Sequence, residues 1–158
     1  MLKKSVFLLI MLYISTLDAR QLEVGGYVPE ILGFDYYSNK IEMTKFGKNK
    51  VVLVKFWSYR CNKCRETMPL AYKRQKKYES KGFIVFVISV GYRTEDYNYL
   101  RDNDLDFSYA ASYKELAGVN SISFSHTPYQ ILVGRDFKIV ALGENISDED
   151  IEKALAKK

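Results

Sequence analysis

The chain of 158 residues contains only two cysteines, Cys61 and Cys64, separated by two residues. Two thiols at this spacing can form a disulfide with each other or supply part of the ligand set of a metal ion. A metal site usually needs more ligands than these, and His126, the single histidine, is the only further candidate. We therefore predict a redox-active dithiol that needs no cofactor. The alternative is a metallochaperone that binds copper or zinc through Cys61, Cys64 and His126.

The position of Cys61 favours ionisation of its thiol. The apolar run over residues 51–57 predicts a buried strand that ends shortly before Cys61, and the residues after it have the pattern of a helix. Free amide groups and the positive end of the helix dipole stabilise a thiolate there, and Arg60 and Lys63 add positive charge. Cys64 lies one turn further along, where we expect more burial. Cys61 is thus expected to attack a substrate disulfide, and Cys64 to resolve the mixed disulfide.

A second apolar run over residues 83–90 resembles the first at residues 51–57. Near-continuous runs of β-branched and aromatic residues are typical of strands buried on both faces of a sheet. Between them, residues 62–80 predict a helix that contains Pro69 and is ended by Gly82. The apolar face of this helix comprises Cys64, Met68, Ala71, Gln75 and Tyr78. Strand, helix and strand together predict a βαβ unit with parallel strands.

The remaining segments predict shorter elements around this unit. A hairpin is expected over residues 129–133 and 137–142, because so short a connection requires antiparallel strands. Ser147 is a suitable cap for a last helix. Further elements are expected as strands near residues 30–34, 40–43 and 107–111, a helix from Thr94, and a brief helix near residues 113–117. The predicted fold class is α/β, with a mixed central sheet and helices on both faces.

Two segments resemble those of a known protein family. Residues 51–69, with Phe56-Trp57 before the cysteines and Pro69 after them, look like the active-site segment of the thioredoxin superfamily. The resemblance is strongest to the extracytoplasmic TlpA/ResA type. Thr127-Pro128, followed by a strand and a hairpin, is similar to the cis-proline segment of that family. The resemblance covers about residues 25–157.

This resemblance implies a thioredoxin-like fold and the activity of a thiol:disulfide oxidoreductase enzyme. It implies that a cis peptide bond precedes Pro128, and that Thr127 and Pro128 hold the substrate chain beside the dithiol. The implied partners are disulfide-containing protein substrates and a redox partner protein. The positive charges near the cysteines shift the potential too little to decide the direction of exchange. The resemblance to the family favours a reductase over an oxidase.

The sequence departs from the family pattern around the dithiol. Arg60 and Lys63 stand where relatives often carry Trp and Pro, and Thr67 replaces the acid of ResA-like proteins. Lys55 occupies the strand position of a buried acid in thioredoxins. Each change adds positive charge or removes a carboxylate. We expect Arg60, Lys63 and Lys55, together with Trp57, to tune the acidity of the thiols.

Two residues of this region each admit more than one interpretation. The stem of Lys55 could pack in the sheet while its amine reaches water at the edge. Alternatively, a partly buried Lys55 amine lies near Cys64, where it stabilises the thiolate or exchanges a proton with it. His126 is interpreted as a loop residue, a modulator of thiol acidity or a metal ligand.

Residues 1–19 have the pattern of a secretory signal or an N-terminal anchor. Lys3 and Lys4 precede an apolar stretch over residues 5–17, and Ala19 offers a cleavage point. Both interpretations place the remaining chain, residues 20–158, outside the cytoplasm as one thioredoxin-like domain. The expected location is periplasmic or secreted, with residues 5–17 as a possible inner-membrane anchor.

The formal net charge of the whole chain is +5, which is a mild basic balance. The densest basic run comprises Lys73, Arg74, Lys76 and Lys77, within the predicted helix. We interpret this run as a solvated helix face rather than a nucleic-acid or membrane surface. No nucleic-acid partner is therefore expected.

Overall fold

The computed structural model describes residues 22–91 and 93–157. The predicted signal or anchor over residues 1–19 lies outside these residues. Within the described part of the chain, no helix has the length and apolar character needed to cross a membrane.

The core of the fold is a five-stranded sheet with the strand order β5-β4-β3-β7-β8. Strands β3, β4 and β5 are parallel, whereas β7 and β8 are antiparallel to their neighbours. The sheet is therefore mixed, as predicted, and every residue of β3 and β4 is buried. The strands are β3 (Val51–Trp57), β4 (Phe83–Ser89), β5 (Tyr109–Ser112), β7 (Tyr129–Val133) and β8 (Ile139–Gly143).

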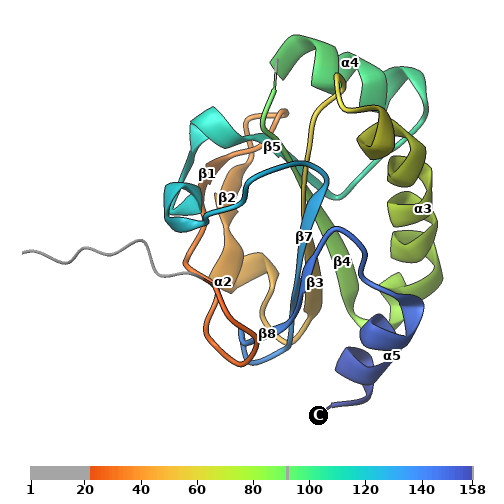
Figure 1. The fold of residues 1–158 in the computed structure, drawn as a ribbon. Helices are drawn as coiled ribbons and strands as arrows, with labels where there is room; N and C mark the ends of the chain where they lie inside the picture. Colours follow the sequence, from red (N-terminus) through yellow and green to blue (C-terminus); the bar gives the residue numbers. More distant parts are fainter. Residues whose placement is uncertain (1–21, 92, 158) are drawn as a thin grey trace, which may run out of the picture.

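Alternate residues of β3 face two apolar cores, one on each side of the sheet. One face packs against the long helices α3 (Asn62–Tyr78), α4 (Arg93–Asp102) and α5 (Asp148–Ala156). The other is covered by the short helix α2 (Met43–Phe46) and a sheet of β2 (Lys40–Glu42), β1 (Leu32–Phe34) and β6 (Leu116–Ala117). The 3-10 turns are η2 (Glu79–Lys81), η3 (Tyr113–Glu115) and η4 (Val119–Ser121). Helices thus lie on both faces, as predicted, although the three long ones share one face (Figure 1).

Helix α3 buries the face that the sequence predicts: Cys64, Met68, Ala71, Gln75 and Tyr78. Pro69 is accommodated within the helix, and Gly82 adopts a left-handed conformation after η2. The basic run on the opposite side is not simply solvated. The Arg74 guanidinium lies 2.6 Å from the Asp148 carboxylate of α5, and the Lys77 amine lies 3.1 Å from it. These ion pairs join α3 to the beginning of α5.

Two glycines provide a matched test of how tightly the chain packs on the face of the central sheet that is covered by β2, β1 and β6. Gly118 has a φ of 84° and Gly25 a φ of 88°, so alanine is strained at either position. A Cβ atom on Gly118 would lie 1.9 Å from the carbonyl oxygen of Glu30, whereas one on Gly25 would meet nothing within 4 Å. Gly118 therefore allows the close approach of the segment before β1.

We predict that Gly118→Ala destabilises the protein more than Gly25→Ala does. The backbone strain is common to both variants, and the overlap at Gly118 should add about 1–3 kcal/mol to the loss. Urea unfolding followed by the fluorescence of Trp57, the only tryptophan, measures both free energies of unfolding. Equal losses in the two variants would contradict the close packing.

Candidate active site

The topology of the sheet brings the two predicted site segments together. Strand β3 leads to Cys61, and β7 runs antiparallel to β3 with Tyr129 opposite Phe56. Because β7 begins where β3 ends, the residues before β7, Thr127 and Pro128, are carried to the same edge of the sheet. Two segments far apart in the sequence therefore meet at the beginning of α3.

Cys61 and Cys64 form a disulfide with each other. Cys61 is the N-cap residue of α3, and its sulfur accepts the backbone N–H of Cys64 at 3.1 Å. Cys64 is completely buried, whereas Cys61 is partly exposed. The Cys61 sulfur is therefore the more accessible one and the Cys64 sulfur the more buried one, as the sequence predicts. A thiolate at Cys61 would receive the same amide hydrogen bond and the field of the helix N-terminus.

The peptide bond between Thr127 and Pro128 is cis. The Cys61 Sγ atom lies 3.4 Å from the carbonyl oxygen of Thr127. Thr127 is partly exposed and Pro128 is buried. The backbone of Thr127 therefore forms one wall beside the accessible sulfur.

Lys55 is only 1% exposed, so the expectation that its amine reaches water at the sheet edge is wrong. Its Nζ atom donates a hydrogen bond to the Thr67 hydroxyl at 3.1 Å. The Thr67 hydroxyl lies 2.9 Å from the carbonyl oxygen of Lys63 and 3.2 Å from that of Cys64. The buried amine is thus connected through one hydroxyl to the backbone of the dithiol segment.

A cavity of about 220 Å³ adjoins the Lys55 side chain. Thr67, Arg74 and Gln130 also line it, together with residues of the loop before α5. Burial lowers the pKa of Lys55 to about 8, and the positive charge of Arg74 contributes to this shift. Lys55 therefore titrates in the range in which a cysteine thiol does.

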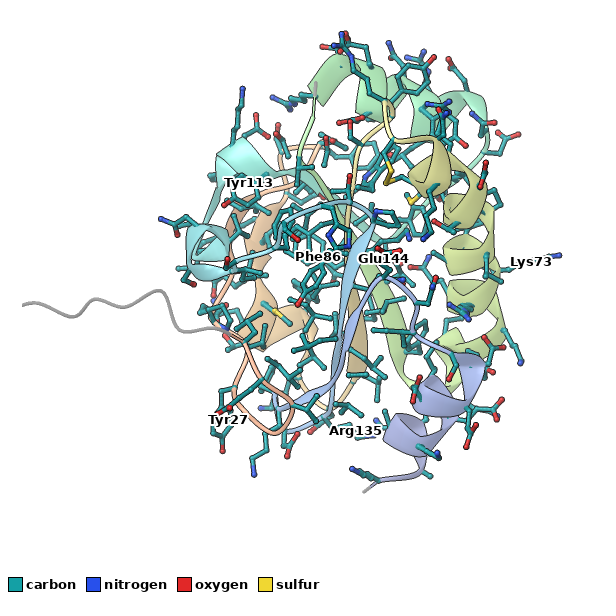
Figure 2. The ribbon with its side chains drawn as sticks, viewed as in Figure 1. Tyr27, Lys73, Phe86, Tyr113, Arg135 and Glu144 are labelled. Atoms are coloured by element: carbon teal, nitrogen blue, oxygen red, sulfur yellow. A yellow bond between two sulfur atoms is a disulfide. The ribbon has the colours of Figure 1, made fainter. Side chains whose placement is uncertain are left out.

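Glu144 lies between β7 and α3 (Figure 2) and partly neutralises the positive charge at the site. One of its carboxylate oxygens pairs with the Lys63 amine, and the other lies 2.7 Å from Nε2 of His126. These contacts lower the pKa of Glu144, the hydrogen bond from Lys63 being the largest cause. Glu144 cannot be recognised from the sequence, because a single acid after a hairpin has no local signal that links it to Cys61.

The remaining candidates occupy different environments. Trp57 is completely buried, its ring centre lies 5.7 Å from that of Tyr99, and its indole N–H has no hydrogen-bond partner among the described residues. Arg60 is exposed. The Nδ1 atom of His126 lies 2.8 Å from the Ser125 hydroxyl. His126 thus contacts Ser125 and Glu144.

The alternative metal site is not assembled in this geometry. The two cysteine sulfurs are bonded to each other, and His126 is engaged with Glu144. Over residues 22–91 and 93–157, no group of three or more His, Cys, Asp or Glu side chains could hold a metal ion.

A model of a protein family described as thioredoxin-like matches residues 49–153. This match includes β3, the dithiol, the cis-proline segment and most of α5. It covers more than half of the chain, so the protein belongs to the thioredoxin-like family. The family match also confirms the fold class predicted from the sequence.

Solved structures of related proteins give the same result. The thioredoxin domain of a thiol-disulfide oxidoreductase from Bacteroides vulgatus is similar, with a TM-score of 0.71 and 25% identity over 87% of this chain and 98% of that one. A thiol:disulfide interchange protein from Bacteroides sp. has a TM-score of 0.70 and 27% identity over 86% and 90% of the two chains. A thiol:disulfide interchange protein from Chlorobium tepidum TLS, 18% identical, has a TM-score of 0.71 over 88% and 99% and supports the fold alone. Comparison with the curated proteins gave no match.

The burial of Lys55 predicts a pH-dependent contribution to stability. The pKa of Lys55 falls from 10.5 to about 8 on folding, so between these values the unfolded chain binds more protons than the folded one. The free energy of unfolding should therefore rise with pH across this range. We expect the difference between wild type and Lys55→Met to change by roughly 2–3 kcal/mol in favour of wild type between pH about 7.5 and 10.

Guanidinium unfolding of the oxidised proteins at these two pH values measures the difference. Oxidised cysteines do not titrate, and tyrosine ionisation affects both proteins alike. Lys73→Met, at an exposed position of α3, is the control and should show no such change. A difference between wild type and Lys55→Met that is independent of pH would exclude a buried, titrating amine.

Proposed function

We propose that the protein is a thiol–disulfide oxidoreductase that exchanges disulfides with exported proteins and acts as a reductase. One observation carries the proposal: the Cys61–Cys64 disulfide caps α3 with its accessible sulfur beside the cis Thr127–Pro128 segment. Thioredoxin-like family membership and the similarity to thiol-disulfide oxidoreductases support it.

The reaction begins with the reduced dithiol. The Cys61 thiolate attacks one sulfur of a substrate disulfide, forms a mixed disulfide and releases the other substrate sulfur as a thiolate, which takes up a proton. The Cys64 thiol then loses its proton and attacks the Cys61 sulfur. This step releases the second substrate thiol and restores the Cys61–Cys64 disulfide. Two electrons pass to the substrate, so a redox partner protein must reduce the disulfide again.

The surroundings of the dithiol suit both steps. The helix N-terminus stabilises the attacking Cys61 thiolate, and the exposed Arg60 adds positive charge. The charge of Lys63 is shared with Glu144, so its effect on Cys61 is smaller than the sequence suggests. Trp57 is completely buried in the apolar core that also contains Cys64, and so contributes to the low polarity around that thiol. Lys55 is assigned to Cys64, whose ionisation is the harder one because that thiol is buried.

The substrate chain would lie against Thr127 and Pro128. The Thr127 carbonyl is already within 3.4 Å of the accessible sulfur, so an extended peptide held by this backbone would present its disulfide to Cys61. Main-chain recognition of this kind gives affinity with little dependence on substrate sequence.

An exported location is part of the proposal. The basic start, the apolar stretch over residues 5–17 and Ala19 support export through a signal or an anchor in the inner membrane. We place the domain in the periplasm or outside the cell, where protein disulfides form and persist.

We predict that a Cys64→Ser variant forms stable mixed disulfides with its protein substrates. The variant retains the attacking sulfur but lacks the resolving one, so the intermediate should accumulate. Expression of the variant in the cell envelope, followed by non-reducing electrophoresis, detects the trapped partners. Cys61→Ser is the matched control and should trap far less protein, because its remaining sulfur is buried. Equal trapping by both variants would contradict the assigned roles.

We predict that Lys55→Met raises the pKa of the Cys64 thiol by about 1 unit, because a nearby positive charge favours the thiolate. The pH dependence of alkylation, followed separately for each cysteine by mass spectrometry, measures this shift in the reduced protein. Lys73→Met again serves as the control. Unchanged thiol pKa values in Lys55→Met would remove Lys55 from the mechanism.

A further inference from the structure

The loop between β3 and α3 is held by a buried carboxylate from another helix. We propose that Asp96 of α4 is a positioning residue for the dithiol, fixing the backbone of this loop and thereby the place of Cys61. The inference rests on the proposed function, because it assigns a role in the same exchange reaction. Asp96 does not touch the reacting sulfurs, so its role is exerted through Tyr59 and the turn that follows.

The Asp96 carboxylate accepts three hydrogen bonds, one from the loop before α3 and two from the end of β4 and the residues after it. Its Oδ1 atom accepts the backbone N–H of Tyr59, two residues before Cys61. Its Oδ2 atom accepts the hydroxyl of Ser89, which ends β4, and the backbone N–H of Gly91 also donates to the carboxylate. Asp96 is completely buried. A buried carboxylate is tolerated only when its oxygens are satisfied in this way, so its position is tightly defined.

The contact at Tyr59 is transmitted directly to Cys61. The carbonyl oxygen of Ser58 accepts the backbone N–H of Cys61 at 3.1 Å, and the Ser58 hydroxyl accepts that of Arg60 at 3.3 Å. Tyr59 lies in the middle of this turn. A carboxylate that fixes the Tyr59 N–H therefore fixes the turn that sets Cys61 at the helix N-terminus.

The chain is fitted closely around this contact. A Cβ atom on Gly91 would lie 2.2 Å from the Ser58 hydroxyl oxygen and 3.0 Å from Oδ2 of Asp96. No side chain fits at position 91 unless the loop or the carboxylate moves. The glycine thus permits β4, the loop and α4 to meet at one point.

A second residue of α4 holds the first turn of α3. The Tyr99 hydroxyl donates to the carbonyl oxygen of Arg65 at 3.2 Å, and the Tyr99 ring centre lies 5.8 Å from that of Tyr59. The Arg65 guanidinium in turn lies over the Tyr59 ring at 5.1 Å. Helix α4 therefore holds both sides of Cys61, with Asp96 on the loop and Tyr99 on the helix.

The carboxylate of Asp96 is stabilised by hydrogen-bond donors from the backbone and from Ser89. Burial raises its pKa, while the bonds from Ser89 and Tyr59 lower it, and the neighbouring charge of Glu95 raises it further. Loss of the carboxylate would leave the buried Ser89 hydroxyl and the Tyr59 N–H without their acceptor. The loop would then relax, and Cys61 would lose part of its alignment with the helix N-terminus.

The test compares Asp96→Asn with Glu95→Gln in the reduced protein. Asparagine keeps the size of the side chain and one acceptor oxygen. Its amide nitrogen cannot accept the hydrogen bond that Oδ2 accepts from Ser89. Glu95→Gln changes an exposed neighbour on the same helix and is the control. We expect the Cys61 pKa, measured by the pH dependence of iodoacetamide alkylation, to rise by about 0.5–1 unit in Asp96→Asn, against the fall that removal of a negative charge alone would cause. At a pH below the Cys61 pKa, the alkylation rate would then fall about 3- to 10-fold.

Ser89→Ala is a second variant, which removes one donor without removing the carboxylate. It should shift the Cys61 pKa in the same direction by a smaller amount. The fluorescence of Trp57, two residues before Tyr59, reports the loop independently and should change in Asp96→Asn but not in Glu95→Gln. Circular dichroism establishes that each variant is folded, and if Asp96→Asn does not fold, Ser89→Ala provides the same measurement.

Wild-type alkylation profiles and fluorescence in Asp96→Asn or Ser89→Ala would overturn the positioning role, whatever the substrate of the protein. The proposed function fails separately if wild-type protein transfers no electrons to protein disulfides. The two failures are distinguishable because the first is read from the thiol itself and the second from exchange with a partner.

Discussion

The pairing of β7 with β3 is the constraint on which the rest of the site depends. Strand β3 is parallel to β4 on one side and antiparallel to β7 on the other, so the end of β3 and the beginning of β7 lie at the same edge. This edge receives the accessible sulfur from one strand and the cis-proline backbone from the other. A shift of β7 by one residue would turn its buried side chains to the wrong face and move Thr127 away from Cys61.

Two charged side chains are buried beneath this edge, and each is held by hydrogen bonds to uncharged groups. Lys55 donates to the Thr67 hydroxyl, and Asp96 accepts from Tyr59, Ser89 and Gly91. A buried charge is costly unless it is hydrogen-bonded, so each of these groups favours the one arrangement that satisfies it. Both are bonded to segments that flank the dithiol. The site is therefore defined by polar contacts as well as by the apolar cores on either side of the sheet.

The sequence predicted those features that depend on local pattern. The strand at residues 51–57, the buried face of α3 and the position of Cys61 before its first turn follow from the spacing of apolar residues and one helix start. The roles of Glu144 and Asp96 cannot be predicted in this way, because each depends on a contact between distant segments. Glu144 contacts Lys63, which is 81 residues away, and Asp96 contacts Tyr59, which is 37 residues away. The sequence predicts a solvated basic run on α3 for the same reason. Its ion pairs with Asp148 form only when α5 packs beside α3.

The electrostatics of the site follow from these contacts rather than from a count of basic residues. Lys63 and His126 share the Glu144 carboxylate. Lys63 and His126 are exposed and Glu144 is partly exposed, so solvent screening weakens their effect. Lys55 is buried and has a pKa of about 8, so it can gain or lose a proton in the range in which thiols titrate. Reduction of the disulfide creates two thiols that must each hold or release a proton, and in the proposed mechanism the charge of Lys55 follows that change. In the proposed mechanism, the pH dependence of the reduction potential then includes the ionisation of Lys55 together with that of Cys64. The direction of exchange depends on how this potential compares with that of the partner, because the free energy of transfer is proportional to the difference between them.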